Sequence, residues 1–113
     1  MHELGVIIEV VKTVEAFVRD NNLTNVQSLT LQVGELSSMV PKYIEELYPI
    51  AVENTILEKA ELVIEILPGL GQCNDCKYHF NLVKHNNICP TCNSKNWSVL
   101  TGTEFLIKEV KAY

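Results

Sequence analysis

The chain lacks the features of a membrane-spanning or secreted protein. Within its 113 residues, no apolar run approaches the roughly 20 residues needed to cross a bilayer. Its start carries Glu3 and Glu9 where a signal peptide would have a positively charged segment and an apolar segment. We therefore expect a soluble, cytoplasmic protein whose four cysteines are reduced thiols or metal ligands rather than two disulfides.

Basic residues are also scarce. The chain has 9 lysines and arginines against 14 aspartates and glutamates, which gives a formal net charge of −5. The acidic excess lies in residues 1–69, whereas residues 70–102 are weakly basic. Because the phosphate backbone of a nucleic acid attracts positive charge, this balance disfavours nucleic acid as a partner.

Residue patterns typical of enzymes are absent as well. We find no Ser-His-Asp arrangement, no paired carboxylates and no phosphate-binding loop. The composition, 47% hydrophobic and 20% charged, is ordinary for a globular protein. The sequence therefore predicts one domain, or one domain with a small appendage, that binds a ligand and is not an enzyme.

Two segments have the spacing of helices. Between residues 4 and 18 the apolar residues recur every three or four positions and predict one buried stripe, formed by Leu4, Ile7, Ile8, Val11, Val14 and Val18. A second helix is expected to begin at Pro41, since proline suits the first turn. Pro49 falls inside this second pattern and predicts a kink or a break into two pieces.

Three segments have the alternation of strands: residues 26–34, 61–67 and 103–110. The strand-helix-strand order of the first two predicts a right-handed crossover between them. The third strand is too short to stand alone and is expected to return to the same sheet. The predicted fold class is α+β, a small mixed three-stranded sheet with two helices. Residues 1–69 with 103–113 would form one domain, and residues 70–102 an inserted zinc-ribbon-like domain.

The inserted segment contains two C-x-x-C pairs, C-N-D-C and C-P-T-C, which supply Cys73, Cys76, Cys89 and Cys92. Each C-x-x-C turn can place two sulfurs on one side of a metal, and two such turns complete the tetrahedron that zinc prefers. Four thiolates leave no open position, so this pattern predicts a structural Zn(II) site. The metal would also stabilise a segment too small to build its own core.

Other interpretations of the cysteine segment are weaker. A thioredoxin-like redox pair needs one C-x-x-C at the start of a helix, which neither pair has. Iron–sulfur ligation by the same four cysteines is compatible with the spacing. His79 and His85 are interpreted as solvent-facing loop residues, because four cysteines already fill the coordination sphere. Trp97 is interpreted as a packing residue of this segment.

The chain begins with M-H-E, followed directly by the first helical pattern. The bulk of His2 should preserve the initiator Met1, whose α-amino group can join the His2 amide and imidazole in two fused chelate rings. The Glu3 amide can add a fourth nitrogen in the same plane, a geometry favoured by Ni(II) and Cu(II). A three-residue motif has a high false-positive rate, and a frayed terminus is the simpler alternative.

Three motifs occur together: M-H-E at the start, G-E-L at residues 34–36, and the paired C-x-x-C turns. In this combination the full length of the chain resembles the HypA/HybF family of hydrogenase maturation factors, which are nickel metallochaperones. The resemblance implies that the protein carries Ni(II) to the large subunit of [NiFe]-hydrogenase. It also implies a HypB-type nickel-binding GTPase as partner, and in some members a role in urease maturation.

The resemblance also implies roles for individual residues. His2 corresponds to the essential nickel ligand, Glu3 contributes its amide, and the four cysteines hold the structural zinc. Some members place an acid near the nickel in the loop after the first strand, where this chain has Val40. The nearby Glu35 and Glu45 are interpreted as ordinary solvated carboxylates.

Two points stay open at the level of sequence. A zinc-ribbon module that binds protein or nucleic acid and carries no nickel is the alternative function. The protein is expected to be a monomer or a homodimer, because an inserted module on short connections would permit domain swapping.

Overall fold

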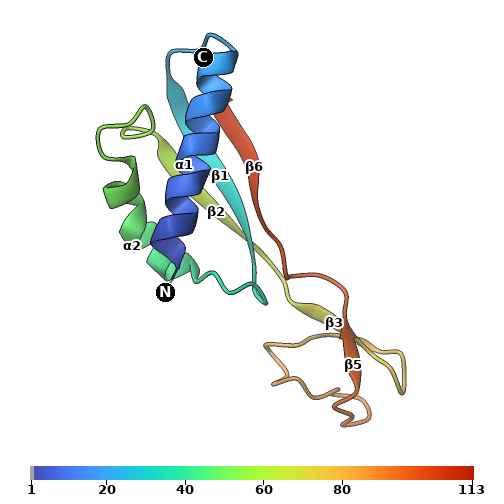
Figure 1. Ribbon diagram of the computed structural model, residues 1–113. Helices are drawn as coiled ribbons and strands as arrows, with labels where there is room; N and C mark the ends of the chain where they lie inside the picture. The colour runs from blue at the N-terminus through green and yellow to red at the C-terminus, as the bar shows by residue number, and fades with distance from the viewer. Residues whose placement is uncertain (1) are drawn as a thin grey trace. The chain divides into compact units, whose positions relative to one another are not determined.

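The computed structural model of the chain describes residues 2–113 and divides them into two compact units (Figure 1). The first unit extends up to Gln32 and includes Met39–Glu65 and Leu106–Tyr113. The second unit comprises Val33–Ser38 and Ile66–Phe105, and thus contains the four cysteines. It also includes a loop, residues 33–38, that the predicted division grouped with the helices. That residues 1–69 with 103–113 bind nickel and residues 70–102 bind zinc stays a prediction.

The first helix, α1, spans Glu3–Asp20 and buries one stripe of side chains. Val10 belongs to this stripe and was missed by the sequence pattern, whereas Leu4 and Ile8 were wrongly included and are 36% and 37% exposed. At 100° per residue, Leu4 and Ile8 lie together at one edge of the stripe, beside the line of Ile7 and Val11. The predicted helical period is therefore correct. The predicted buried face of α1 is rotated by a few tens of degrees from the observed one.

The second helix, α2, spans Pro41–Val52 and packs against α1. Pro41 occupies the first turn as predicted, and Ile44, Tyr48 and Val52 form the buried face. The helix runs through Pro49 without a break, so the predicted division into two pieces is wrong. Proline there removes a hydrogen bond only in the last turn, which ends three residues later.

The first sheet has the strand order β2-β1-β6, with β1 at Val26–Gly34, β2 at Glu61–Leu67 and β6 at Phe105–Ala112. In Figure 1, β1 and β2 run in one direction and β6 runs in the other. The backbone groups of Asn25 and Tyr113 bond to each other in both directions, at 2.8 and 3.0 Å, as in an antiparallel pair. This is the mixed three-stranded sheet with two helices predicted from the sequence.

The central strand β1 is buried more completely than a strand with one buried face. Leu29 and Leu31 have no exposed surface, but Ser28 and Thr30 on the opposite face are also only 8% and 7% exposed. In a central strand, side chains from both neighbouring strands stand beside each residue on the same face and reduce its exposure. Conversely, Ile66 in the edge strand β2 is 48% exposed, although the alternation of residues 61–67 would place it on the same face as Leu62 and Ile64.

The second unit contains a smaller antiparallel sheet with the order β4-β3-β5, formed by Leu70–Cys73 (β3), His79–Asn81 (β4) and Trp97–Val99 (β5). Its buried core consists of Cys73, Phe80, Leu82 and Cys89. Trp97 packs against this core, which confirms its predicted structural role. Two of the four core residues are cysteines, so little apolar surface is available to stabilise the unit.

Among the described residues, no helix is both long enough and apolar enough to cross a membrane.

We predict that burial, not helix propensity, determines the contribution of α2 to stability. Ile44 is fully buried and Ile50 is 60% exposed in the same helix. Ile44→Ala should lower the free energy of unfolding by about 2–5 kcal/mol, and Ile50→Ala should change it by less than about 0.5 kcal/mol. Urea unfolding of the two variants measures the difference. Equal losses would contradict the assigned packing of α2.

Candidate metal centres

The two C-x-x-C turns have the same backbone geometry. In the first, the Cys73 N–H donates to the Tyr78 carbonyl (2.9 Å), and the Cys73 carbonyl accepts from the Lys77 N–H (2.9 Å). The turn that begins at Cys89 repeats both bonds at the same offsets, at 2.9 and 2.8 Å. The fifth residue of each turn has a positive φ, 67° at Lys77 and 62° at Asn93. Each turn thus directs its two sulfurs to one side.

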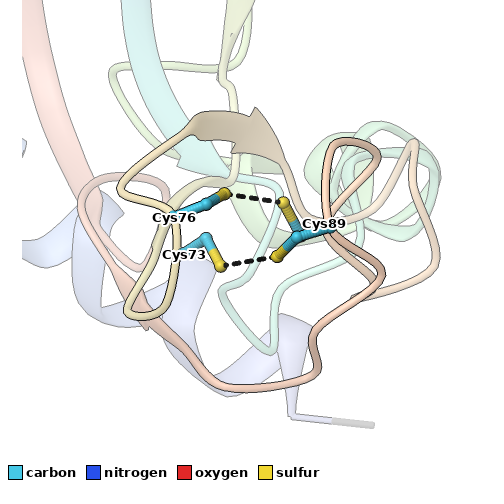
Figure 2. Close-up of side chains that lie close together, drawn as sticks. Cys73, Cys76 and Cys89 are labelled. Carbon is cyan, nitrogen blue, oxygen red and sulfur yellow. Dashed lines mark hydrogen bonds between the residues drawn. The ribbon is translucent and has the colours of Figure 1, made fainter.

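All four sulfurs lie within 4.8 Å of one another. The Sγ atoms of Cys73 and Cys92 are 3.5 Å apart, as are those of Cys76 and Cys89 (Figure 2). A tetrahedron with Zn–S distances of about 2.3 Å has edges of about 3.8 Å, so the cluster has the size of a zinc site. These separations are far longer than a disulfide bond, and all four cysteines are free thiols.

Electrostatics within the cluster favour a bound cation. The N–H of Cys76 stabilises the Cys73 thiolate and, against the effect of burial, lowers the pKa of Cys73 to about 6. At Cys92 the N–H of Ser94 acts in the same sense, but the neighbouring Cys73 thiol and burial outweigh it and raise the pKa to about 12. Ionisation of one cysteine therefore makes ionisation of its neighbour less favourable. A divalent cation at the centre would remove this conflict and allow all four to ionise.

The two histidines of the segment stand outside the sulfur cluster. His79 is exposed but lies in strand β4, so its assignment to a loop was wrong. The ring of His85 meets the ring of Phe80 edge-on, with centroids 6.1 Å apart. Four sulfur donors with no added ligand would give a bound metal a closed site of the structural kind.

The N-terminal candidate residues lie at the beginning of α1. His2 has an exposed side chain and immediately precedes the helix, and its carbonyl accepts from the Val6 N–H (3.2 Å). Glu3 is the first helical residue, and its N–H belongs to the first turn, where no intrahelical acceptor exists. His2 therefore directly precedes a residue whose backbone N–H is not part of the helix hydrogen-bond pattern. Met1 lies outside the described residues.

The Glu3 side chain has a role that the sequence did not predict. It is only 3% exposed, and its Oε2 accepts from the Val40 N–H at 3.3 Å. The pKa of Glu3 is lowered mainly by its own backbone N–H and further by that of Val40, against the effect of burial. This carboxylate joins the start of α1 to the start of α2. An acid in a first helical turn was the available signal, but its partner is 37 residues away.

Val40 itself is the N-cap residue of α2, and its side chain is 41% exposed. It offers no carboxylate, so a nickel ligand from this position of the loop is absent, as the sequence predicted.

Glu35 is exposed, as expected, but its carboxylate makes two hydrogen bonds that the sequence did not predict. Its Oε1 accepts from the Gly69 N–H (2.8 Å) and from the Asn81 side-chain amide (3.0 Å). The Gly69 bond, followed by the Asn81 bond, lowers the pKa of Glu35 below its ordinary value. Glu45 is exposed, as expected.

The fold and the four-thiol cluster define a small α+β metal-binding protein. Residues 1–112 match the family model described as "Hydrogenase/urease nickel incorporation, metallochaperone, hypA". The chain belongs to the HypA family of hydrogenase/urease nickel-incorporation metallochaperones.

Curated relatives extend over almost the whole chain. The hydrogenase maturation factor HypA of Trichodesmium erythraeum is 38% identical over 112 residues, covering 98% of this chain and 95% of its own. The factor of the same name from Geobacter metallireducens is 34% identical over 111 residues, covering 98% of each chain.

Solved structures agree at the level of the fold. The solution structure of the Ni metallochaperone HypA from Helicobacter pylori has a TM-score of 0.66 at 22% identity, covering 99% of this chain and 97% of that one. A second solution structure of a HypA protein has a TM-score of 0.69 at 22% identity, covering 100% and 97%.

We predict that the first cysteine turn is strained at Lys77. A residue with a Cβ at φ 67° carries a steric cost that glycine avoids. Lys77→Gly should therefore leave the free energy of unfolding of the zinc-loaded protein unchanged or raise it by up to about 1 kcal/mol. Lys95→Gly, at an exposed position without a positive φ, is the matched control and should not stabilise. Denaturant unfolding measures both. A loss at Lys77 larger than at Lys95 would contradict the strain.

Proposed function

We propose that this chain binds Ni(II) at its N-terminus and delivers it during maturation of [NiFe]-hydrogenase. Membership of the nickel-incorporation family supports the metal and the process. The observation that supports this location is the exposed His2 immediately before Glu3, whose backbone N–H has no acceptor within the helix, at the start of α1. Nickel is the cargo of this protein, and its site must therefore both bind and release.

The proposed nickel donors are the Met1 amine, the amide and imidazole nitrogens of His2, and the Glu3 amide. Four nitrogens in one plane suit Ni(II). Glu3 contributes through its backbone, because its carboxylate is buried and accepts from the Val40 N–H. That carboxylate instead fixes the start of the helix relative to Val40. Donors at an exposed chain end can be passed to a partner one by one, which suits transfer.

We further propose that Cys73, Cys76, Cys89 and Cys92 hold a structural Zn(II). The sulfur separations and the mutual destabilisation of thiolates support a divalent cation at their centre. Zinc would cross-link the two cysteine turns and would take no part in a reaction. Because the core of this unit has few apolar residues beside the cysteines, metal binding should provide much of its folding free energy.

The proposed partners are a HypB-type nickel-binding GTPase and the large subunit of [NiFe]-hydrogenase, with urease maturation proteins as further candidates. GTP hydrolysis belongs to the partner, and this chain acts by binding and not by catalysis. The proposed location is the cytoplasm, where these partners would be met and where the thiols stay reduced.

We predict that nickel binding requires both His2 and a free chain end. His2→Ala and a form with residues added before Met1 should each lose the high-affinity nickel site, as measured by isothermal titration. The extension keeps every side chain and removes only the free amine. A matched control, His79→Ala, removes an exposed imidazole in the cysteine unit and should bind normally. Equal binding by all forms would exclude the terminal site.

We also predict a pH dependence that separates the two metals. The His2 imidazole must be neutral and the amides must lose protons to bind nickel, so protons compete with the metal. Nickel affinity should fall as the pH is lowered from neutral to mildly acidic, while zinc is retained to lower pH. Metal analysis after equilibration across this range measures both. An affinity for nickel that stays constant would contradict the nitrogen donor set.

Metal stoichiometry distinguishes the chaperone from a zinc-ribbon module without nickel. The chaperone should contain one tightly held zinc and one exchangeable nickel per chain. Cys89→Ser should lower the zinc content and unfold the second unit, because Cys89 is fully buried in its core. Elemental analysis and circular dichroism measure these changes. Zinc alone, with no nickel bound, would favour the rival module.

A further inference from the structure

The segment Gly34–Leu36 is bonded to the backbone that leaves the cysteine segment. The Gly34 N–H donates to the Glu104 carbonyl (2.7 Å), and the Leu36 N–H donates to the Gly102 carbonyl (2.7 Å). A side-chain carbon at position 34 would overlap the Gly102 carbonyl oxygen. The approach is therefore so close that only glycine fits at position 34.

Glu35, the central residue of this segment, is bonded to the backbone that enters the cysteine segment. Its N–H donates to the Leu67 carbonyl (2.9 Å), and its Oε1 accepts from the Gly69 N–H (2.8 Å). The same oxygen accepts from the side chain of Asn81 (3.0 Å), at the end of β4. One carboxylate oxygen thus joins the incoming connection to a strand of the cysteine sheet.

Leu36 extends this attachment into the core. It packs against the cluster of Cys73, Phe80, Leu82 and Cys89. A side-chain carbon at Gly69 would lie 2.7 Å from its Cγ, so glycine is again needed for the approach. The segment consequently depends on the same small core that contains two of the four metal-binding thiols.

The chain continues from this segment through Ser38 and Met39 to Val40, whose N–H donates to the carboxylate of Glu3. The position of Val40 therefore influences the first turn of α1, in which the proposed nickel donors begin. A change in the segment can reach this turn along the backbone itself.

We propose that Glu35 is a positioning residue that makes Gly34–Leu36 part of the cysteine unit, so that metal occupancy of the four cysteines sets the order of this segment. Without metal, the thiols lose their cross-link, and Gly69 and Asn81 no longer hold the carboxylate in place. The hydrogen bonds are then exchanged for water. The consequence for nickel release, through Val40 and Glu3, rests on the proposed function.

Amide hydrogen exchange in the full-length chain tests the positioning role directly. In the zinc-loaded protein, the amides of Gly34, Glu35 and Leu36 should be protected, and removal of zinc by a chelator should speed their exchange about tenfold or more. Zinc-loaded Glu35→Ala should show a similar increase while it keeps its zinc. Glu35→Gln, which retains a carbonyl oxygen acceptor, should restore much of the protection.

Two controls separate this role from general destabilisation. Glu46→Ala, an exposed glutamate of α2, should leave the exchange of the segment unchanged. The amides of Leu29 and Leu31 in the buried strand β1 should exchange at wild-type rates in Glu35→Ala. Wild-type protection of the segment in zinc-loaded Glu35→Ala, or protection that survives zinc removal, would overturn the proposal.

A second measurement, made with nickel, distinguishes this proposal from the function on which it rests. Glu35→Ala should release nickel to a competing chelator about threefold or more faster than wild type, with Glu35→Gln close to wild type. Equal release rates would overturn the connection to nickel. If the wild-type terminus binds no nickel, the proposed function fails, and the exchange experiment still decides the role of Glu35.

Discussion

The mutual repulsion of four closely spaced thiolates is the constraint on which the second unit depends. The sulfurs lie within 4.8 Å of one another, and ionisation of one raises the cost of ionising the next. The proposed divalent cation would convert this repulsion into a cross-link between two otherwise separate turns. Beside its two buried cysteines, the surrounding core contains Phe80 and Leu82, with Leu36 and Trp97 packed against it. Because this apolar core is small, we expect the three short strands and the Gly34–Leu36 segment to depend on the proposed metal.

The first unit is stabilised by apolar burial instead of by a metal. Its two helices and three strands bury a conventional apolar core, in which Ile7, Leu29 and Ile44 have no exposed surface. This core fixes α1, and the carboxylate of Glu3 fixes the first turn against Val40. The exposed His2 is therefore attached to a helix whose start is held in place. That combination suits a nickel site which must be defined in geometry and accessible for exchange.

Much of this organisation could be predicted from local patterns. The helical period of residues 4–18, the alternation of residues 61–67 and the spacing of the cysteines each depend on neighbours within a few positions. The errors arose where distant parts of the chain decide the outcome. Ser28 and Thr30 are covered because β1 is a central strand, and Ile66 is exposed because β2 is an edge. The error at Pro49 had a local cause instead: it leaves α2 unbroken because it falls in the last turn.

Glu3 and Glu35 show most clearly what could not be predicted from the sequence. The sequence by itself determined the two helices and the three strands of the first sheet, the fold class and which residues can bind metals, since these follow from period, spacing and donor chemistry. The short strands of the cysteine segment were not predicted. Only the tertiary structure decided that Glu3 contacts Val40 and that Glu35 contacts Gly69 and Asn81, across 37, 34 and 46 residues. A carboxylate on an exposed loop and one that joins two segments have the same local sequence. They differ only in the donors that folding brings to them.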